Sequence, residues 1–420
     1  MTLRHRIRPF RARLLLLLAV IGPGIITANV DNDASGITTY SVAGAHYGYS
    51  LLWLMPLVAL ALIVVQEMSA RLGIVTGKGL ADLIRENIGF RWTTIIIGLM
   101  LIANLANTVS EFAGVAASME IFGISKFVSV PVVALGVWLL IVKGSYKHVE
   151  RIFLIASALY LTYIASGIIA HPPWDQVARA AITPTFHFDV GYVTIFVTII
   201  GTTIAPWMQF YQQASIVDKG LKATELSYER IDVILGSVFA VVVAAFITIA
   251  CAATLFANGI QIATAEDAAL ALRPLAGVNA STLFAFGLFN ASVFSAAILP
   301  LSTAYVVCEA FGWEMGVSRS FKEAPIFFSI YTALIALGAG IILLPVRSLI
   351  DTMLSSQTLN GVLLPVILIV MLRLINNKRL MGRYVNGRLF NLLAWGTVVI
   401  LIGLTLILIV TSWFPQVLSR

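Results

Sequence analysis

Charged residues are scarce in this sequence, and their scarcity excludes an ordinary soluble domain. Only 11% of the 420 residues are Asp, Glu, Lys or Arg, whereas 59% are hydrophobic, and the mean hydropathy is +0.95. An average soluble domain carries about 25% charged residues. The sequence therefore predicts an all-α polytopic membrane protein whose main partner is the lipid bilayer.

Cysteine and histidine are also rare, with two and five residues. Cys251 and Cys308 lie in apolar segments without metal-ligand spacing, so neither a disulfide framework nor a structural zinc site is expected. No catalytic motif occurs at mechanistic spacing, so we expect neither an enzyme nor a cofactor. The net charge of +7 comes from Lys and Arg in short loops, which membrane orientation explains without a nucleic-acid partner. No obligatory protein partner is evident.

Apolar runs long enough to cross a bilayer recur along the chain. The eleven predicted spans are residues 14–46, 51–72, 93–119, 128–142, 152–170, 190–215, 231–256, 281–309, 325–345, 350–373 and 392–413. Alternating spans place most Lys and Arg on one side. We expect one integral domain, residues 1–420, in the plasma or inner membrane, with a cytoplasmic N-terminus and an outer C-terminus.

Two of these spans, the first and the sixth, are interrupted. The first carries Asp31, Asn32 and Asp33 at a depth where an acidic side chain costs about 3 kcal/mol or more. The sixth carries Pro206, which removes a backbone donor. Each interruption lies in the first span of a block of five spans. Because five is odd, the second block enters the membrane from the opposite side, so it is inverted relative to the first block. The predicted units are residues 14–170 (helices 1–5), 190–373 (helices 6–10) and 392–413 (an additional helix 11).

Five short motifs are spread over nearly the whole chain. They are GPG at 22–24, GYSLLW at 48–53, SARLGIVTGKGL at 69–80, SEFAG at 110–114 and NKRLMG at 377–382. This set resembles that of the NRAMP divalent-metal transporters. The resemblance implies a LeuT-like fold with a 5+5 inverted repeat, broken helices 1 and 6, and alternating-access transport. It also implies that the carbonyls of Val30 and Thr202 face the ion at the two breaks.

The metal-binding motifs of that family are only partly present. The family's helix-1 motif is Asp-Pro-Gly-Asn. In this chain Asp33 stands at the position of its aspartate and Gly36 at the position of its asparagine. On helix 6, Ala205 stands at the position of the family's methionine. The family's tenth-helix glutamine matches Gln357. Thioethers favour softer ions and oxygen ligands suit Mg²⁺, which usually keeps several waters. The pattern resembles the NRAMP-related magnesium transporters, so we expect uptake of partly hydrated Mg²⁺ and also Mn²⁺.

The residues that carry protons in the family are mostly replaced. Its helix-6 histidines match Trp207 and Gln212, which do not titrate near neutral pH. On the third helix the glutamate is kept as Glu111, but the aspartate three residues earlier is Thr108. We therefore expect transport without proton coupling. A potential of 100 mV contributes about 2.3 kcal/mol per charge, hence about 4.6 kcal/mol for a divalent ion.

The candidate site residues fall into two groups. The predicted metal-site residues are Asp33, Val30, Thr202, Gln357, Ala205 and Gly36. The predicted water-shell residues are Asn32, Asp31, Trp207, Gln209, Gln212, Asn360 and Glu111. Amides in membrane bundles often join helices instead, and a buried glutamate often has a structural role, so both alternatives stay open for the second group.

Other functions are compatible with parts of this pattern. The nearest alternative is a proton-coupled Mn²⁺/Fe²⁺ importer that tolerates the altered motifs. The same architecture also serves transporters of amines and amino acids. Asp33 at the break argues against an anionic substrate, but a cationic amine or amino acid remains an alternative. A channel is disfavoured because paired broken helices indicate alternating access.

Overall fold

The structure is a computed structural model, and it describes Val30 and residues 32–143, 161–187, 189–273, 277–345 and 348–413. Every regular element within these ranges is a helix. Nine of the described helical segments are long and apolar enough to cross a membrane. The predicted class, an all-α polytopic membrane protein, is confirmed.

The helices have the following bounds. They are α3 (Ala34–Tyr47), α4 (Leu54–Thr76), α5 (Leu80–Ile88), α6 (Phe90–Glu120), α7 (Lys126–Lys143), α9 (Leu161–Ile169), α10 (Trp174–Ile182), α11 (Val190–Thr203), α12 (Pro206–Lys219), α13 (Leu226–Thr254), α14 (Ala265–Ala269), α16 (Ala280–Phe311), α17 (Pro325–Leu343), α18 (Leu349–Ile375), α19 (Lys378–Met381) and α20 (Arg388–Trp413). Short 3-10 helices lie at Ala223–Glu225, Phe256–Asn258, Leu270–Leu272, Gly277–Asn279 and Gly382–Tyr384.

The predicted spans correspond to these helices wherever the structure describes them. Nine of the eleven coincide with the long helical segments, although several helices extend further. The seventh span, predicted from residue 231, begins at Leu226 because helical hydrogen bonding continues into polar sequence beyond an apolar run. About half of the first span and about half of the fifth lie outside the described residues, which include the ends of these spans as α3 and α9.

Both predicted interruptions are breaks in the helices. Val30 is helical, Asn32 and Asp33 are not, and α3 begins at Ala34. The sixth span divides into α11 and α12, separated by Ile204 and Ala205. Pro206 occupies the first position of α12. A backbone N–H at this position has no partner within the helix, so proline costs α12 no hydrogen bond. The sixth span is therefore two half-helices, as predicted.

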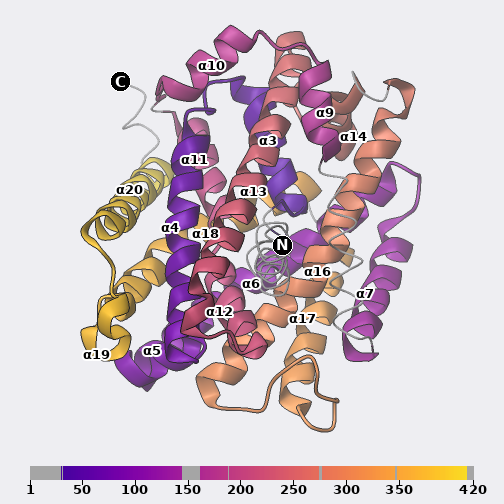
Figure 1. Ribbon diagram of the computed structural model, residues 1–420. Helices are drawn as coiled ribbons and strands as arrows, with labels where there is room; N and C mark the ends of the chain where they lie inside the picture. Colours follow the sequence, from indigo (N-terminus) through magenta and orange to yellow (C-terminus); the bar gives the residue numbers. More distant parts are fainter. Residues whose placement is uncertain are drawn as a thin grey trace, which may run out of the picture.

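Helix α6 lies at the centre of the bundle, where it packs against α16, α18, α17 and α3 (Figure 1). Glycine allows two of the closest crossings. A Cβ on Gly114 of α6 would overlap Ala34 of α3, and a Cβ on Gly201 of α11 would overlap the backbone of α18 at Gln357. Small residues let membrane helices approach closely. The first crossing lies at the beginning of α3, and Gln357 at the second crossing contacts Asp33, directly before α3.

The connections between helices separate into two ends of the molecule. In Figure 1 α5 and α19 lie at one end, whereas α10 and α14 lie at the other. The end with α5 and α19 carries basic side chains such as Lys78, Arg85, Arg379 and Arg383. We call this the basic end and the other the α14 end. The positive-inside rule predicts that the basic end is cytoplasmic.

Candidate ion-binding site

Asp33 stands at the N-terminus of α3, in the first break. Its backbone is extended (φ −66°, ψ −179°), and its carboxylate accepts a hydrogen bond from the Gly36 N–H at 2.6 Å. An N-cap aspartate is a common way to satisfy a free helical N–H. The second carboxylate oxygen lies 3.4 Å from Nε2 of Gln357 on α18. Asp33 is only 3% exposed, so the structure joins two of the predicted site residues in the interior.

A second carboxylate lies directly behind the first break. Glu111 of α6 is fully buried, and its Oε2 accepts a hydrogen bond from the Ala34 N–H at 3.3 Å. Its Oε1 has no hydrogen-bond partner among the described residues. Ser35 and Ser110 join the same two helices through their hydroxyls. The acid of α6 is thus held against the start of α3, next to Asp33.

At each break, backbone carbonyls lack their usual helical donors, and Val30 and Thr202 provide an example at each break. In a continuous helix the Val30 carbonyl would accept from the Ala34 N–H, but that N–H donates to Glu111. The Thr202 carbonyl would accept from residue 206, which is proline and has no N–H. Carbonyls released in this way need a partner other than lipid. These are the two carbonyls that the sequence predicts to face the ion.

A chain of amides connects the site to α6. Gln357 Oε1 accepts from Asn360 Nδ2 at 2.7 Å, and Asn360 exchanges two hydrogen bonds with Asn107 of α6, at 3.0 and 3.2 Å. All three side chains are buried. Asn107 was not among the predicted residues. Asn104, Asn107 and Glu111 form a polar stripe at helical spacing on α6, and this stripe is the sequence signal that indicates it.

Three predicted water-shell residues bind the protein itself. Asn32 donates to the Ala240 carbonyl of α13 at 3.3 Å. Gln209, in the amide orientation that satisfies both of its ends, donates to the carbonyls of Ala205 and Pro206 at 2.9 and 2.8 Å. Trp207 is buried and packs against Tyr211 with ring centroids 6.2 Å apart. These side chains shape the two breaks by packing and backbone hydrogen bonds.

The remaining candidates differ in what surrounds them. Gln212 is fully buried, and neither end of its amide has a hydrogen-bond partner among the described residues. Ala205 caps α12 with extended backbone and no side-chain donor or acceptor. Gly36 lies in the first turn of α3. Asp31 lies outside the described residues.

The arrangement offers oxygen ligands and little else. One carboxylate at the break, the Gln357 amide and two released carbonyls are hard donors that suit divalent ions of the Mg²⁺ and Mn²⁺ kind. No group of three or more His, Cys, Asp or Glu side chains is close enough to hold a metal ion in the described part of the chain. Such a sparse donor set suits an ion that keeps part of its water shell.

The sequence matches one protein-family model over residues 24–411, that of the natural resistance-associated macrophage protein-like (Nramp) proteins. The chain belongs to the Nramp family. Its relatives include the divalent metal cation transporters MntH of Granulibacter bethesdensis (25% identical, covering 94% of this chain and 89% of that protein) and of Bacillus subtilis (26%, covering 97% and 95%). Relatives of this kind are transporters, which confirms the expectation that the chain is not an enzyme.

Solved structures show the same fold. The Eremococcus coleocola manganese transporter is similar with a TM-score of 0.78 and 24% identity, over 95% of this chain and 88% of that one. Mhp1, a nucleobase-cation-symport-1 family transporter, is similar with a TM-score of 0.59 and 15% identity, over 95% of both chains. The predicted LeuT-like fold is therefore confirmed.

Proposed function

We propose that this Nramp protein carries divalent metal cations across the membrane by alternating access, with the ion held between the two helix breaks. One observation carries the proposal: the Asp33 carboxylate lies next to Gln357, while Val30 and Thr202 each have a carbonyl that lacks its helical donor. Broken helices that supply carbonyls to a cation at the midplane are the common device of this architecture.

The choice of ion rests on two kinds of support. Relatives named as divalent metal cation or manganese transporters support Mn²⁺. The chain's own departures, Gly36 and Ala205, support Mg²⁺ in addition, because they remove an amide and a thioether and leave oxygen donors. We therefore propose Mn²⁺ and Mg²⁺ as substrates, bound partly hydrated.

Two coupling modes compete. Uncoupled transport is supported by this chain's α12, where Trp207 and Gln212 stand in place of histidines. A proton-coupled Mn²⁺ importer is supported more directly by the relatives, and by Glu111, whose buried Oε1 has no partner among the described residues. A membrane potential of 100 mV already contributes about 4.6 kcal/mol to the entry of a divalent ion. We propose the uncoupled mode, with the proton-coupled importer as the second candidate.

Uptake by proteoliposomes separates these candidates. Vesicles containing a pH-sensitive dye receive Mg²⁺, Mn²⁺ or Ca²⁺ at a fixed potential, with Asp33→Ala as the inactive control. The proposal expects Mg²⁺ and Mn²⁺ entry without internal acidification. Acidification that accompanies Mn²⁺ entry, together with failure of Mg²⁺ to compete, establishes the second candidate. Calorimetric binding of an organic amine in place of either metal would instead support the amine transporter.

The membrane arrangement is part of the proposal. We place the protein in the cell membrane with the basic end and the N-terminus in the cytoplasm and the α14 end outside, as the distribution of Lys and Arg favours. The repeats remain those of the sequence, 14–170 and 190–373, followed by a helix at 392–413. Proteolysis or labelling of the α5 and α14 ends in intact cells tests the orientation.

A further inference from the structure

A buried polar cluster lies between α12 and α13, away from the two helix breaks. Its members are Gln212 of α12 and Glu229 and Asp232 of α13, and all three side chains are 0% exposed. Glu229 and Asp232 are three positions apart, so they share one face of α13. Asp232 lies close enough to Glu229 for direct electrostatic interaction, and Gln212 faces Glu229 from the neighbouring helix. We call these three residues the inner cluster.

Two members of the inner cluster have polar atoms without partners. Neither carboxylate oxygen of Glu229 and neither end of the Gln212 amide has a hydrogen-bond partner in the described part of the chain. Glu229 lies in the first turn of α13, where free helical N–H groups are available, yet it accepts no bond from them. Buried polar groups in native proteins are nearly always hydrogen-bonded, and a buried charge is strongly unfavourable unless it is paired. The inner cluster is therefore suited to a positively charged ligand.

The charges around the inner cluster favour a divalent cation. Glu229 forms no ion pair among the residues that the structure describes. The adjacent Arg230 binds Glu67 of α4 at 2.8 Å instead. Lys219 lies close to Glu229 at the exposed end of α12, but one positive charge cannot balance two carboxylates. Carboxylate and amide oxygens are hard ligands, and Mg²⁺ is commonly held by one or two carboxylates while it keeps several waters.

The inner cluster lies between the ion-binding site and the basic end. Helix α12 runs from the second break toward α5, and Gln212 follows Ala205 by seven residues (Figure 1). On α13, Asp232 precedes Ala240 by eight residues, and the Ala240 carbonyl accepts a hydrogen bond from Asn32 of the first break. At 1.5 Å per helical residue these separations are about 10–12 Å. Both helices therefore place the cluster at a similar distance from the breaks.

We propose that Glu229, Asp232 and Gln212 form a second binding site for a hydrated divalent cation of the Mg²⁺ and Mn²⁺ kind, separate from the site at Asp33. This second site rests on the proposed function, since it gives the same class of ion a further position toward the basic end. Three protein ligands leave about three of six positions to water, so we expect a weak site with a dissociation constant of about 1 mM.

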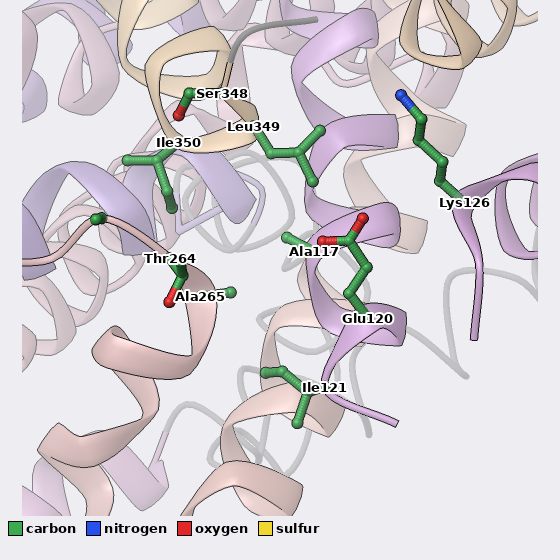
Figure 2. Close-up of a pocket in the computed structure, with 10 residues that line it drawn as sticks. Ala117, Glu120, Ile121, Lys126, Thr264, Ala265, Ser348, Leu349 and Ile350 are labelled. Atoms are coloured by element: carbon green, nitrogen blue, oxygen red, sulfur yellow. The ribbon is translucent and has the colours of Figure 1, made fainter. Parts of the chain in front are cut away.

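Backbone cleavage by bound iron locates the second site. Fe²⁺ is the probe, because it binds at oxygen sites for Mg²⁺ and Mn²⁺, and with ascorbate and peroxide it produces hydroxyl radicals that cut the chain beside the metal. Mass spectrometry of the purified protein identifies the cuts. Glu229→Gln and Asp232→Asn each remove one charge and retain the shape of the side chain. Glu120→Gln is the matched control, since Glu120 is exposed and lines a cavity at the opposite, α14 end (Figure 2).

We expect cuts around Glu229 in the unmodified protein, half suppressed by about 1 mM Mg²⁺. Glu229→Gln and Asp232→Asn should each reduce these cuts at least about fivefold, because each removes a ligand charge. Glu120→Gln and Asp33→Asn should leave the cuts around Glu229 unchanged. Their absence from the unmodified protein, their persistence at full yield in both cluster variants, or their resistance to Mg²⁺ overturns the proposal.

The position of the cuts separates this result from the proposed function. Fe²⁺ held at Asp33 should cut near the two breaks, around residues 30–36 and 202–206, and these cuts should disappear in Asp33→Asn. Cuts at the breaks that are absent from the unmodified protein, or unchanged in Asp33→Asn, contradict the proposed function and do not bear on the inner cluster.

Thermal unfolding gives a second measurement that does not depend on cleavage. In the Asp33→Asn protein, 10 mM Mg²⁺ should raise the melting temperature by about 1–2 °C, because a ligand at about ten times its dissociation constant stabilises the folded state. The double variant Asp33→Asn/Glu229→Gln should show no such shift. Its melting temperature without Mg²⁺ also reports whether it folds. An absent shift in Asp33→Asn contradicts the second site.

Discussion

Replacing Asp33 by asparagine separates its two roles. The carboxylate caps α3 through the Gly36 N–H at 2.6 Å, and it also places one negative charge at the break. Asparagine caps helices about as well as aspartate, whereas alanine costs about 1 kcal/mol at this position. Asp33→Asn therefore removes the charge and retains the cap, and Asp33→Ala removes both.

The expected loss of affinity follows from the charge. A divalent ion about 4 Å from a carboxylate gains about 8 kcal/mol at an effective dielectric constant of about 20. Desolvation of the ion and of the buried carboxylate offsets much of this gain. Losing one partner of a buried charge pair costs about 2–5 kcal/mol. We therefore expect Asp33→Asn to weaken Mn²⁺ binding by about 3 kcal/mol, which is more than about 100-fold in Kd.

Calorimetry with Mn²⁺ and thermal unfolding of the purified protein measure the two roles together. Asp33→Asn should lose ion binding and keep a melting temperature close to that of the unmodified protein, whereas Asp33→Ala should lose both binding and some stability. Uptake into proteoliposomes should be abolished in both. Binding of Mn²⁺ to Asp33→Asn within about threefold of the unmodified protein would refute the role of Asp33 as ligand.

Three further predictions follow from particular contacts. Ala205→Met adds a thioether at the second break. Titration with Cd²⁺ and with Mg²⁺ should show that the affinity for Cd²⁺ rises about tenfold relative to the affinity for Mg²⁺. An unchanged ratio of the two affinities places residue 205 away from the ion. Gly201→Ala forces a methyl group against the backbone of α18 at Gln357, and it should cost about 1–3 kcal/mol of stability in thermal unfolding. Gly340→Ala is the control and should leave stability unchanged, because its methyl group meets open space. Arg71→Gln breaks a buried ion pair with Glu67 (2.9 Å) and hydrogen bonds to the loop before α20. Glu67 keeps its second partner, Arg230, at 2.8 Å, so we expect a loss of about 2 kcal/mol, and an unchanged melting temperature contradicts it.

The spans and the breaks were predictable from sequence for a simple reason. A bilayer demands about 20 apolar residues per crossing, so hydropathy alone marks the helices. A proline or an acidic residue inside such a run interrupts it locally, wherever its neighbours lie. The break between α11 and α12 at Pro206 follows from this, as does the non-helical backbone of Asn32 and Asp33 before α3.

Partners within the site were harder to predict. Asn107 joins Asn360 across 253 positions of sequence, and no spacing rule relates α6 to α18. Gln209 was a candidate for the water shell, yet its amide binds the backbone at the start of its own helix. Side chains of this kind bind whichever polar group the packing brings nearest, so local sequence does not determine their roles.

The sequence by itself therefore determined the membrane class, the two broken helices and Asp33 as the acid of the first break, because each depends on local composition within a bilayer. Only the tertiary structure decided that Glu111 takes the Ala34 N–H and so leaves the Val30 carbonyl without its helical donor. It also decided that α3 packs against Gly114 of α6 and Met353 of α18. These features arise from how distant helices cross, and the crossing is set by close packing of the whole bundle.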